Sequence, residues 1–276
     1  MKKNRIIPVV LFRNGYVVQS TCFQRYKNIG NPLLTINRLS EWGADEVCFL
    51  DISENRYWGE SREDLREKVG VTFLEVLREA SLFANMPLTC GGGVRTFEDF
   101  EQRIESGADK IAINSLLFTN SNLVTNFASE YGKQCLIGSV DVRKIDNKYI
   151  VYVENGKLST EYEVNEWVRK IEDLGVGEIL LNSIDRDGSG LGYDIELLEL
   201  VCLNTTVPVI ALGGVKDSKD LAEGLIRTNV DAVAAANYFQ HRKLSVYRSH
   251  KELHELGLNV RPPRLDSTEY GKDGVK

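Results

Sequence analysis

Short runs of apolar, often β-branched residues alternate along this chain with longer segments whose apolar positions recur at helical spacing. Eight apolar runs predict strands, at residues 5–12, 46–52, 88–90, 110–114, 135–142, 178–184, 209–212 and 232–236. Helices are predicted between them, in segments such as 31–42, 96–106, 165–174 and 218–226. This alternation is typical of a parallel sheet covered by helices, and eight strands favour a single α/β domain of the (β/α)8 or TIM-barrel type over an open sheet.

The two halves of the chain resemble each other. The sequence GGVR at 92–95 recurs as GGVK at 213–216, about 121 residues later, and the positions that follow repeat as well. The pattern predicts a two-fold half-barrel repeat with two similar binding features on the face where the strands end. The alternative is that glycine after a strand is common in any repeat of strand and helix.

The length of 276 residues is compatible with one domain, because such barrels use about 250 residues. We expect the barrel to cover residues 1–262 and a polar, flexible tail to cover residues 263–276. An apolar run at 148–153 followed by Asn155 and Gly156 predicts a small hairpin inserted after the fifth strand.

Composition and charge exclude several classes of protein. Hydrophobic residues make up 42% and charged residues 27%, as in a globular domain, and the net charge of −6 argues against nucleic-acid binding. The five cysteines include no C-x-x-C pair, which predicts a reduced, cytoplasmic protein. The apolar run at 6–12 is too short for a signal peptide, and no stretch reaches the roughly 20 apolar residues of a membrane span.

Glycine and polar residues gather where the predicted strands end. Glycines there allow backbone N–H groups to approach an anion, and a following helix start adds a positive dipole. Two sets predict two phosphate sites facing each other across the barrel mouth, although tight turns would also use these glycines. The first set is Gly93, Asn114 and Ser115, the second is Gly214, Ala236 and Asn237, and Asp187 and Gly188 are assigned to the same substrate site.

The sequence contains no motif for a metal or a cofactor. His241, His250 and His254 lie beyond the last strand without a carboxylate or cysteine at ligand spacing, so we interpret them as solvated helix residues. Neither a P-loop nor a dinucleotide-binding glycine motif is present. The carboxylates at strand ends, Asp141 among them, remain for catalysis. We therefore expect no metal and no cofactor.

Taken in order, the strand-end motifs resemble the cyclase subunit of imidazole glycerol phosphate synthase, a barrel that works with a glutaminase subunit in histidine biosynthesis. The resemblance covers nearly the whole chain and rests on RIIP at 5–8, FLDI at 49–52, GGG at 91–93, GADK at 107–110, SIDRDG at 183–188, GYD at 192–194 and NVR at 259–261. It implies a glutaminase partner at the N-terminal barrel face, passage of ammonia along the barrel axis, and a bis-phosphorylated substrate at the mouth. The positions that match the family's substrate site are Gly93, Asn114, Gly188, Gly214 and Ala236, with Ser115 and Asn237 as polar substitutes.

The resemblance also implies two catalytic aspartates, of which this chain keeps one. Asp141 matches the aspartate that ends the family's fifth strand. Leu11 stands where an aspartate ends the first strand, and leucine cannot transfer a proton. Gln19 and Leu212 replace a lysine and a serine of the same reacting centre. These differences predict inefficient closure of the imidazole ring.

Four charged residues stand at strand starts, each directly before an apolar run. They are Arg5, Glu46, Lys110 and Glu178, and they match the family's ring of charges where ammonia enters the barrel. Two cations and two anions can satisfy one another, which burial requires. A salt-bridged plug that only closes the barrel floor would explain these charges equally well.

Two functions remain open. One is a genuine cyclase subunit of histidine biosynthesis, supplied with ammonia by a glutaminase and acting on a phosphorylated small molecule. The other is a diverged barrel that passes ammonia to a third protein or to another acceptor, such as a nucleotide-linked or surface-polysaccharide sugar. The second function fits a resemblance to paralogues that accompany sugar amidotransferases. Leu11 favours the diverged barrel, and the paired phosphate sites favour the cyclase.

Overall fold

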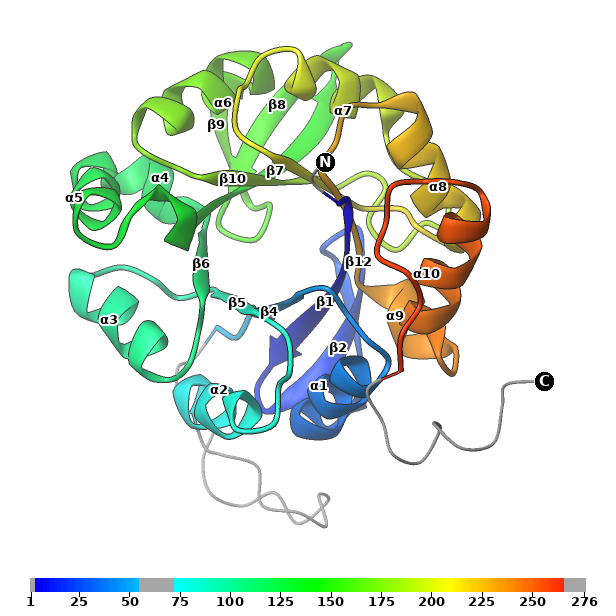
Figure 1. Ribbon diagram of the computed structural model, residues 1–276. Coiled ribbons are helices and arrows are strands. Elements are labelled where there is room, and N and C mark those ends of the chain that lie inside the picture. The colour runs from blue at the N-terminus through cyan, green and yellow to red at the C-terminus, as the bar shows by residue number, and fades with distance from the viewer. Residues whose placement is uncertain (1–2, 55–71, 266–276) are drawn as a thin grey trace.

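The computed structural model describes residues 3–54 and 72–265. The barrel strands are β1 (Arg5–Arg13), β4 (Val47–Asp51), β5 (Leu88–Gly91), β6 (Lys110–Ile113), β7 (Leu136–Ile145), β10 (Glu178–Ser183), β11 (Val209–Leu212) and β12 (Ala232–Ala235). Each pairs in parallel with its neighbours in the order β10–β11–β12–β1–β4–β5–β6–β7, and pairing of β7 with β10 closes the ring (Figure 1). The predicted α/β barrel is therefore confirmed.

Helices surround the strands on the outside of the barrel (Figure 1). They are α1 (Pro32–Glu41), α2 (Phe73–Ser81), α3 (Phe97–Glu105), α4 (Ser115–Thr119), α5 (Ser121–Tyr131), α6 (Val164–Asp173), α7 (Ile195–Cys202), α8 (Ser218–Arg227), α9 (Asn237–His241) and α10 (Ser245–Glu255), with a short 3-10 helix η1 (Lys133–Cys135) before β7. The four segments that served as examples of helical spacing correspond to α1, α3, α6 and α8. Of the described helices, none combines the length and the apolar character needed to cross a membrane.

The two halves of the barrel repeat in local geometry as well as in sequence. Gly92 and Gly213 both have positive φ, +94° and +102°, in the turns that follow β5 and β11. In the next helix of each half, Asp99 and Asp220 accept a hydrogen bond from the backbone N–H four residues earlier, at 2.8 and 2.7 Å. The repeat thus specifies the same turn and helix start twice, at opposite sides of the mouth.

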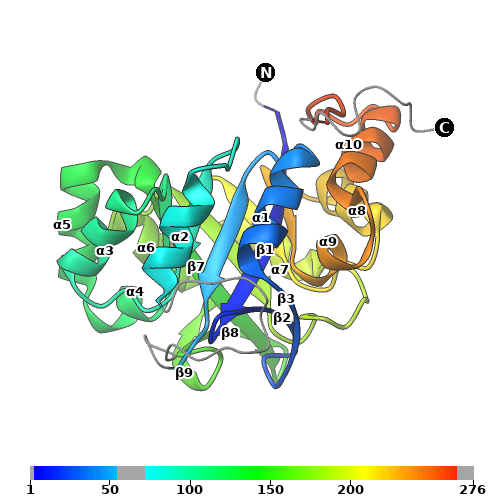
Figure 2. The ribbon, with the colours of Figure 1, turned by 90° about the horizontal axis from the view of Figure 1, so that it is seen from below.

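Two antiparallel extensions rise from the first strand of each half. β1 continues into β2 (Tyr16–Thr21) and β3 (Arg25–Gly30), and β7 continues into β8 (Lys148–Val153) and β9 (Leu158–Glu163). Figure 2 shows both extensions at the same end of the barrel, where the strands finish. The β8–β9 hairpin was predicted, whereas the β2–β3 hairpin was not.

A two-residue turn was the signal for the missed hairpin. Asn14 and Gly15, with φ of +49° and +86°, connect Arg13 to its cross-strand partner Tyr16. Asn-Gly with positive φ at both positions is the preferred turn between two antiparallel strands. The sequence interpretation treated this pair only as the end of an apolar run.

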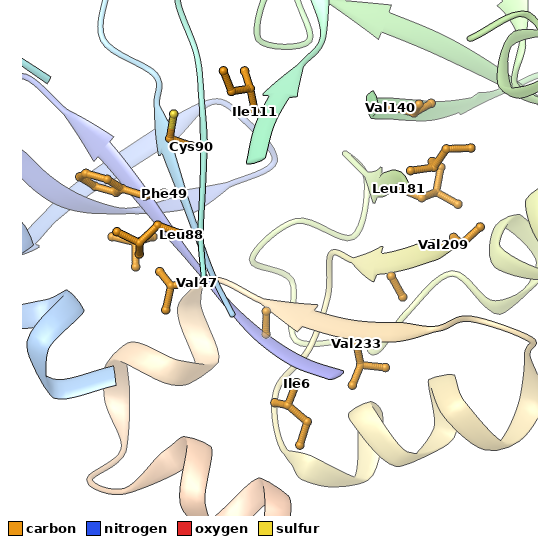
Figure 3. Packing of buried hydrophobic residues seen from close by; sticks show 14 of the residues in the cluster. Ile6, Val47, Phe49, Leu88, Cys90, Ile111, Val140, Leu181, Val209 and Val233 are labelled. Carbon is orange, nitrogen blue, oxygen red and sulfur yellow. The ribbon is translucent and has the colours of Figure 1, made fainter. Parts of the chain in front are cut away.

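Side chains of the strands separate into two apolar clusters. Those facing outward pack against the helices and form the main core, as Ile6, Phe49, Leu181 and Val233 do in Figure 3. Those facing inward fill the barrel interior, and the buried ones are Ile7, Val9, Cys48, Ala112, Ile137, Leu180, Ile210, Ala232 and Ala234. The barrel is therefore a packed body with a polar layer only at its two ends.

The chain segment after α10 returns to the start of the barrel. Val260 forms a parallel bridge with Asn4, next to the first residue of β1. Of the predicted tail, residues 266–276 lie outside the described residues, so the division of the chain at 262 stays a prediction.

Candidate functional site

Asp141 lies at the mouth, where β7 leaves the barrel, and its side chain points inward. The residue is 8% exposed, and its two carboxylate oxygens accept hydrogen bonds from Nδ2 of Asn182 at 3.1 Å and Nδ2 of Asn114 at 3.0 Å. Burial raises the pKa of Asp141 to about 7, although the Asn182 hydrogen bond lowers it and the charge of Asp187 raises it further. At neutral pH both protonation states are populated, which suits a group that accepts and returns a proton.

Asn182 is a site residue that the sequence interpretation missed. It pairs with Asp141 on β7 and with Leu212 on β11, so it stands between the polar and the apolar side of the mouth. The signal was alternation along β10, since Glu178, Leu180 and Asn182 share the inward face.

The opposite side of the mouth is apolar. Leu11, Leu50, Leu212 and Ala236 pack on the cluster that fills the barrel interior, and each is half-buried. They come from β1, β4, β11 and the residue after β12, whereas the polar groups around Asp141 come from β6, β7 and β10. The acid and its amide partners therefore lie on one side of the mouth, and an apolar surface formed by these four residues lies on the other.

The first predicted phosphate set is brought together at the ends of β5 and β6. The Ser115 hydroxyl accepts a hydrogen bond from the backbone N–H of Glu154 at 3.1 Å and donates to Oδ1 of Asn114 at 3.4 Å. The Asn114 amide is already bonded to Asp141, and Gly93 adopts φ of +66° in an exposed turn. The side chains of this set are bonded within the protein, so an anion here would depend on backbone N–H groups.

Asn237 of the second predicted set, and Gly188 beside the same site, contact the β2–β3 hairpin. Nδ2 of Asn237 donates to the carbonyl oxygen of Ser20 at 2.8 Å, and a Cβ on Gly188 would collide with that same oxygen. A Cβ on Gly214 would collide with the carbonyl of Gly192, and Ala236, directly before Asn237 in the chain, is half-buried. The polar atoms of this set hold the hairpin in the present conformation.

Asp187 is the main attachment of the hairpin. Its carboxylate accepts hydrogen bonds from the Ser20 hydroxyl at 2.6 Å and the Phe23 backbone N–H at 3.3 Å. Its carbonyl accepts from the Cys22 backbone N–H at 3.0 Å, and Gln19 contacts His241 further along. Burial raises the pKa of Asp187, while these hydrogen bonds lower it. In this conformation Asp187 positions the chain above the mouth.

The four charges at the opposite end of the barrel form a closed ring of alternating sign. Arg5 reaches Glu46 at 2.6 Å and Glu178 at 3.1 Å, and Lys110 reaches the same two carboxylates at 2.9 and 3.3 Å. Glu46 is 2% exposed and accepts a further hydrogen bond from the Thr89 hydroxyl at 2.5 Å. Burial lowers the pKa of Arg5, but the two glutamates outweigh it, and the net pKa is raised. The ring is complete, and each charge has two partners of opposite sign.

One histidine differs from the sequence interpretation. His250 is 1% exposed, and its ring nitrogens lie 3.1 Å from the Arg261 carbonyl and 3.2 Å from the Asp45 carboxylate. The interpretation as a solvated residue is wrong for His250, because the segment after α10 folds back over it. It is right for His241 and His254, which are exposed. Within residues 3–54 and 72–265, no group of three or more His, Cys, Asp or Glu side chains could hold a metal ion.

Comparison with known proteins agrees with these motifs. The histidine biosynthesis protein family matches residues 5–245. The chain is 38% identical over 265 residues to the imidazole glycerol phosphate synthase subunit HisF of Alkaliphilus metalliredigens, covering 95% of this chain and 100% of that protein. It is 39% identical over 261 residues to a Vibrio vulnificus protein with the provisional name imidazole glycerol phosphate synthase subunit hisF2. This match covers 95% of this chain and 92% of that protein. The predicted resemblance is confirmed, and the chain belongs to the histidine biosynthesis protein family.

Proposed function

We propose that the chain is the barrel subunit of a glutamine-dependent amidotransferase, in which a glutaminase partner delivers ammonia at the charged floor. The ammonia is passed to an acceptor at the mouth that differs from the histidine-pathway substrate. The observation that carries this proposal is the contrast between a complete charge ring at the floor and a mouth in which Leu11 lies across from the buried acid Asp141. The other buried acid of the mouth, Asp187, is bonded to Ser20 and Phe23.

Two features of the floor support ammonia entry: the energetic cost of burying its four charges and their arrangement as a ring of ion pairs. Removing four charges from water costs several kcal/mol per ion, which an apolar barrel floor would avoid. A ring of ion pairs that opens transiently can admit a small neutral molecule, and the apolar interior above it disfavours ions. Arg5, Glu46, Lys110 and Glu178 therefore act as the gate in this proposal.

The floor also carries an apolar rim that suits a protein partner. Leu82 and Leu203 are 82% and 80% exposed, and Ile226 and Leu256 are also exposed. They lie at or just beyond the last residues of α2, α7, α8 and α10, which end near the floor because each helix runs back toward the next strand start. Exposed apolar groups around a charged centre are typical of an interaction surface. We assign this face to the glutaminase.

The mouth supports a transfer that needs one proton-transfer group. Asp141 can take a proton from an attacking amine and return it to a leaving group, because its pKa of about 7 is close to neutral pH. Closing an imidazole ring needs a second group, and the position of Leu11 offers none. An activated sugar, nucleotide-linked or part of a surface polysaccharide, or an acceptor held by a third protein, fits such a transfer.

Isotope tracing tests the proposal. The purified chain and its cognate glutaminase are given glutamine labelled with ¹⁵N in the side-chain amide, together with a panel of phosphorylated and nucleotide-linked sugars. Mass spectrometry then locates the label. We expect it in a sugar or in a third protein. Label in imidazole glycerol phosphate, at rates comparable to an authentic cyclase, would refute the diverged acceptor.

A second candidate function is the cyclase reaction of histidine biosynthesis. The favouring observation is that the match covers the full length of proteins named imidazole glycerol phosphate synthase subunit HisF, including that of Chlorobium phaeovibrioides at 38% identity over 261 residues. This function predicts turnover of the histidine-pathway substrate with free ammonium salts alone. The two candidates are separated by that single assay.

A further inference from the structure

The β7–β8 hairpin presents one face to the mouth. Asp141 and Arg143 are two residues apart on β7, so their side chains share a face, and Tyr152 of β8 is the cross-strand partner of Asp141. Contact between the Arg143 guanidinium and the Tyr152 ring, 5.3 Å from its centroid, confirms that both lie on this face. An arginine therefore stands beside the buried acid of the mouth, about 7 Å further along the strand.

Arg143 has no ion-pair partner in the part of the chain that the structure describes. It is half-buried, and its Nε is buried without a hydrogen-bond acceptor. Its neighbour Lys144 is exposed and lies on the other face, where Glu196 binds it at 2.6 Å. The two adjacent cations of one strand thus differ in kind, since one is neutralised within the protein and the other is not.

A guanidinium that lies over an aromatic ring interacts with it through its flat face, so the N–H groups at its edge can still bind an anion. Its planar fork matches two oxygens of one phosphate or carboxylate, and stacking reduces the freedom lost on binding. A half-buried cation with an unpaired N–H is unfavourable until an anion supplies the missing acceptor. Among the residues that the structure describes, no carboxylate forms an ion pair with Arg143, and Asp141 on the same face is bonded to Asn114 and Asn182 instead, which points to a ligand.

We propose that Arg143, supported by Tyr152, binds an oxyanion of the acceptor next to Asp141. The assignment to an acceptor rests on the proposed function, whereas the oxyanion site stands on this hairpin alone. The ligand chemistry is a phosphate or carboxylate group whose two oxygens face the guanidinium. Arg143 is then a specificity residue, which selects acceptors carrying a negative charge close to the atom that reacts.

Nuclear magnetic resonance of the arginine Nε–H groups tests this site directly. The Arg143 signal is assigned in the full chain by its disappearance in Arg143→Lys and Arg143→Gln, and the chain is titrated with inorganic phosphate and, separately, with acetate. We expect a saturable shift of this signal with at least one anion. A lower saturating concentration for phosphate identifies a phosphate group, and one for acetate identifies a carboxylate.

Matched variants distinguish a specific oxyanion site at Arg143 from nonspecific attraction of anions by positive charge. Arg143→Lys keeps the charge but loses the fork, and we expect binding, followed by the neighbouring backbone signals, to weaken about tenfold or more. Lys144→Gln removes the adjacent, already paired cation and should leave the affinity unchanged. Asp141→Asn should tighten binding several-fold at alkaline pH, because a negative charge beside the anion is removed.

The site is refuted if neither anion gives a saturable shift of the Arg143 signal, or if Lys144→Gln weakens binding as much as Arg143→Lys. Circular dichroism shows whether each variant folds, and the wild-type titration decides the question even if Arg143→Gln does not. Because no glutaminase or ammonia is used, a negative result here leaves the amidotransferase proposal intact. A negative result in isotope tracing likewise leaves the oxyanion site standing.

Discussion

The two ends of the barrel handle charge in opposite ways. At the floor, Arg5, Glu46, Lys110 and Glu178 neutralise one another in a closed ring. At the mouth, Asp141 has only amide partners among its direct hydrogen bonds, and burial raises its pKa to about 7. The floor charges are paired with groups of opposite sign, whereas the mouth acid has a pKa near neutral pH.

This difference teaches which end performs chemistry. Ion pairs that satisfy each other are suited to a boundary that stays closed and opens as a unit. A buried carboxyl whose pKa is raised to about 7, such as Asp141, is suited to proton transfer. In the proposed function, the complete ring at the floor delivers ammonia, and the reaction that consumes it depends on the mouth, where Leu11 replaces an acid.

The largest expected effect falls on the mouth. Asp141→Asn removes the proton acceptor while keeping its size, and ammonia-driven transfer should fall by about 10²–10⁴-fold. The rate is measured with free ammonium salts, and circular dichroism verifies the fold. Asp185→Asn, at an exposed acid that follows the next strand, is the matched control and should keep its rate. Transfer that survives in Asp141→Asn would exclude Asp141 as the acid–base group.

The next effect falls on the floor. Lys110→Ala leaves Glu46 and Glu178 with one cation between them, and the free energy of unfolding should fall by about 3–5 kcal/mol. Glutamine-driven transfer should be lost while ammonia-driven transfer persists. Arg227→Ala breaks an exposed pair with Glu223 and should cost less than about 1 kcal/mol. Equal loss of both kinds of transfer would show that the ring is only a structural plug.

A third effect is a pH dependence of the free energy of unfolding that arises from Asp141 at the mouth. The folded chain holds the Asp141 proton up to about pH 7, whereas an unfolded Asp releases it near pH 3.9. The protonated Asp141 therefore makes its full contribution to the free energy of unfolding below about pH 4. As pH rises through 7 that contribution is lost, and the free energy of unfolding falls by about 2–4 kcal/mol. Urea unfolding across this range should show the decline in wild type and a smaller decline in Asp141→Asn. Identical slopes would contradict a raised pKa.

The smallest effect concerns the hairpin above the mouth. Asp187→Asn weakens the hydrogen bonds from Ser20 and Phe23, and should lower the local opening free energy of β2–β3 by about 1–3 kcal/mol. Amide hydrogen exchange measures this, with the β8–β9 hairpin as an internal reference. Unchanged protection of β2–β3 would mean that Asp187 does not hold it.

Hydrophobic periodicity predicted the barrel because each strand is short, apolar and followed by a helix. All eight barrel strands begin and end within a few residues of their predicted bounds. The β2–β3 hairpin was missed because β3 (Arg25–Gly30) is largely polar and exposed, and the sequence signal was confined to the Asn14–Gly15 turn between β1 and β2. The inserted β8–β9 hairpin was found because its first strand is an apolar run at 148–153 followed by Asn155 and Gly156.

The candidate site residues lie at the strand starts and strand ends where the sequence placed them, and their functional roles stay predictions. The ring at the floor, Asp141 and the glycine turns could be placed because parallel strands begin and end at common faces. The covering of Asn237 and Gly188 by Ser20 could not be seen, since it joins residues more than 160 positions apart through a turn of unknown direction. For the same reason the burial of His250 against Asp45 was missed.

The sequence by itself determined the order of strands and helices, the two-fold repeat, and which charges stand at each end of the barrel. These are local properties, set by side-chain periodicity, turn chemistry and the direction of parallel strands. Only the tertiary structure decided which groups satisfy one another: the closed floor ring, the amide pair around Asp141, and the hairpin held by Asp187. Burial and pairing energies depend on distances between segments remote in sequence, and a carboxylate acquires its pKa from those distances and from exclusion of water, which no local pattern encodes.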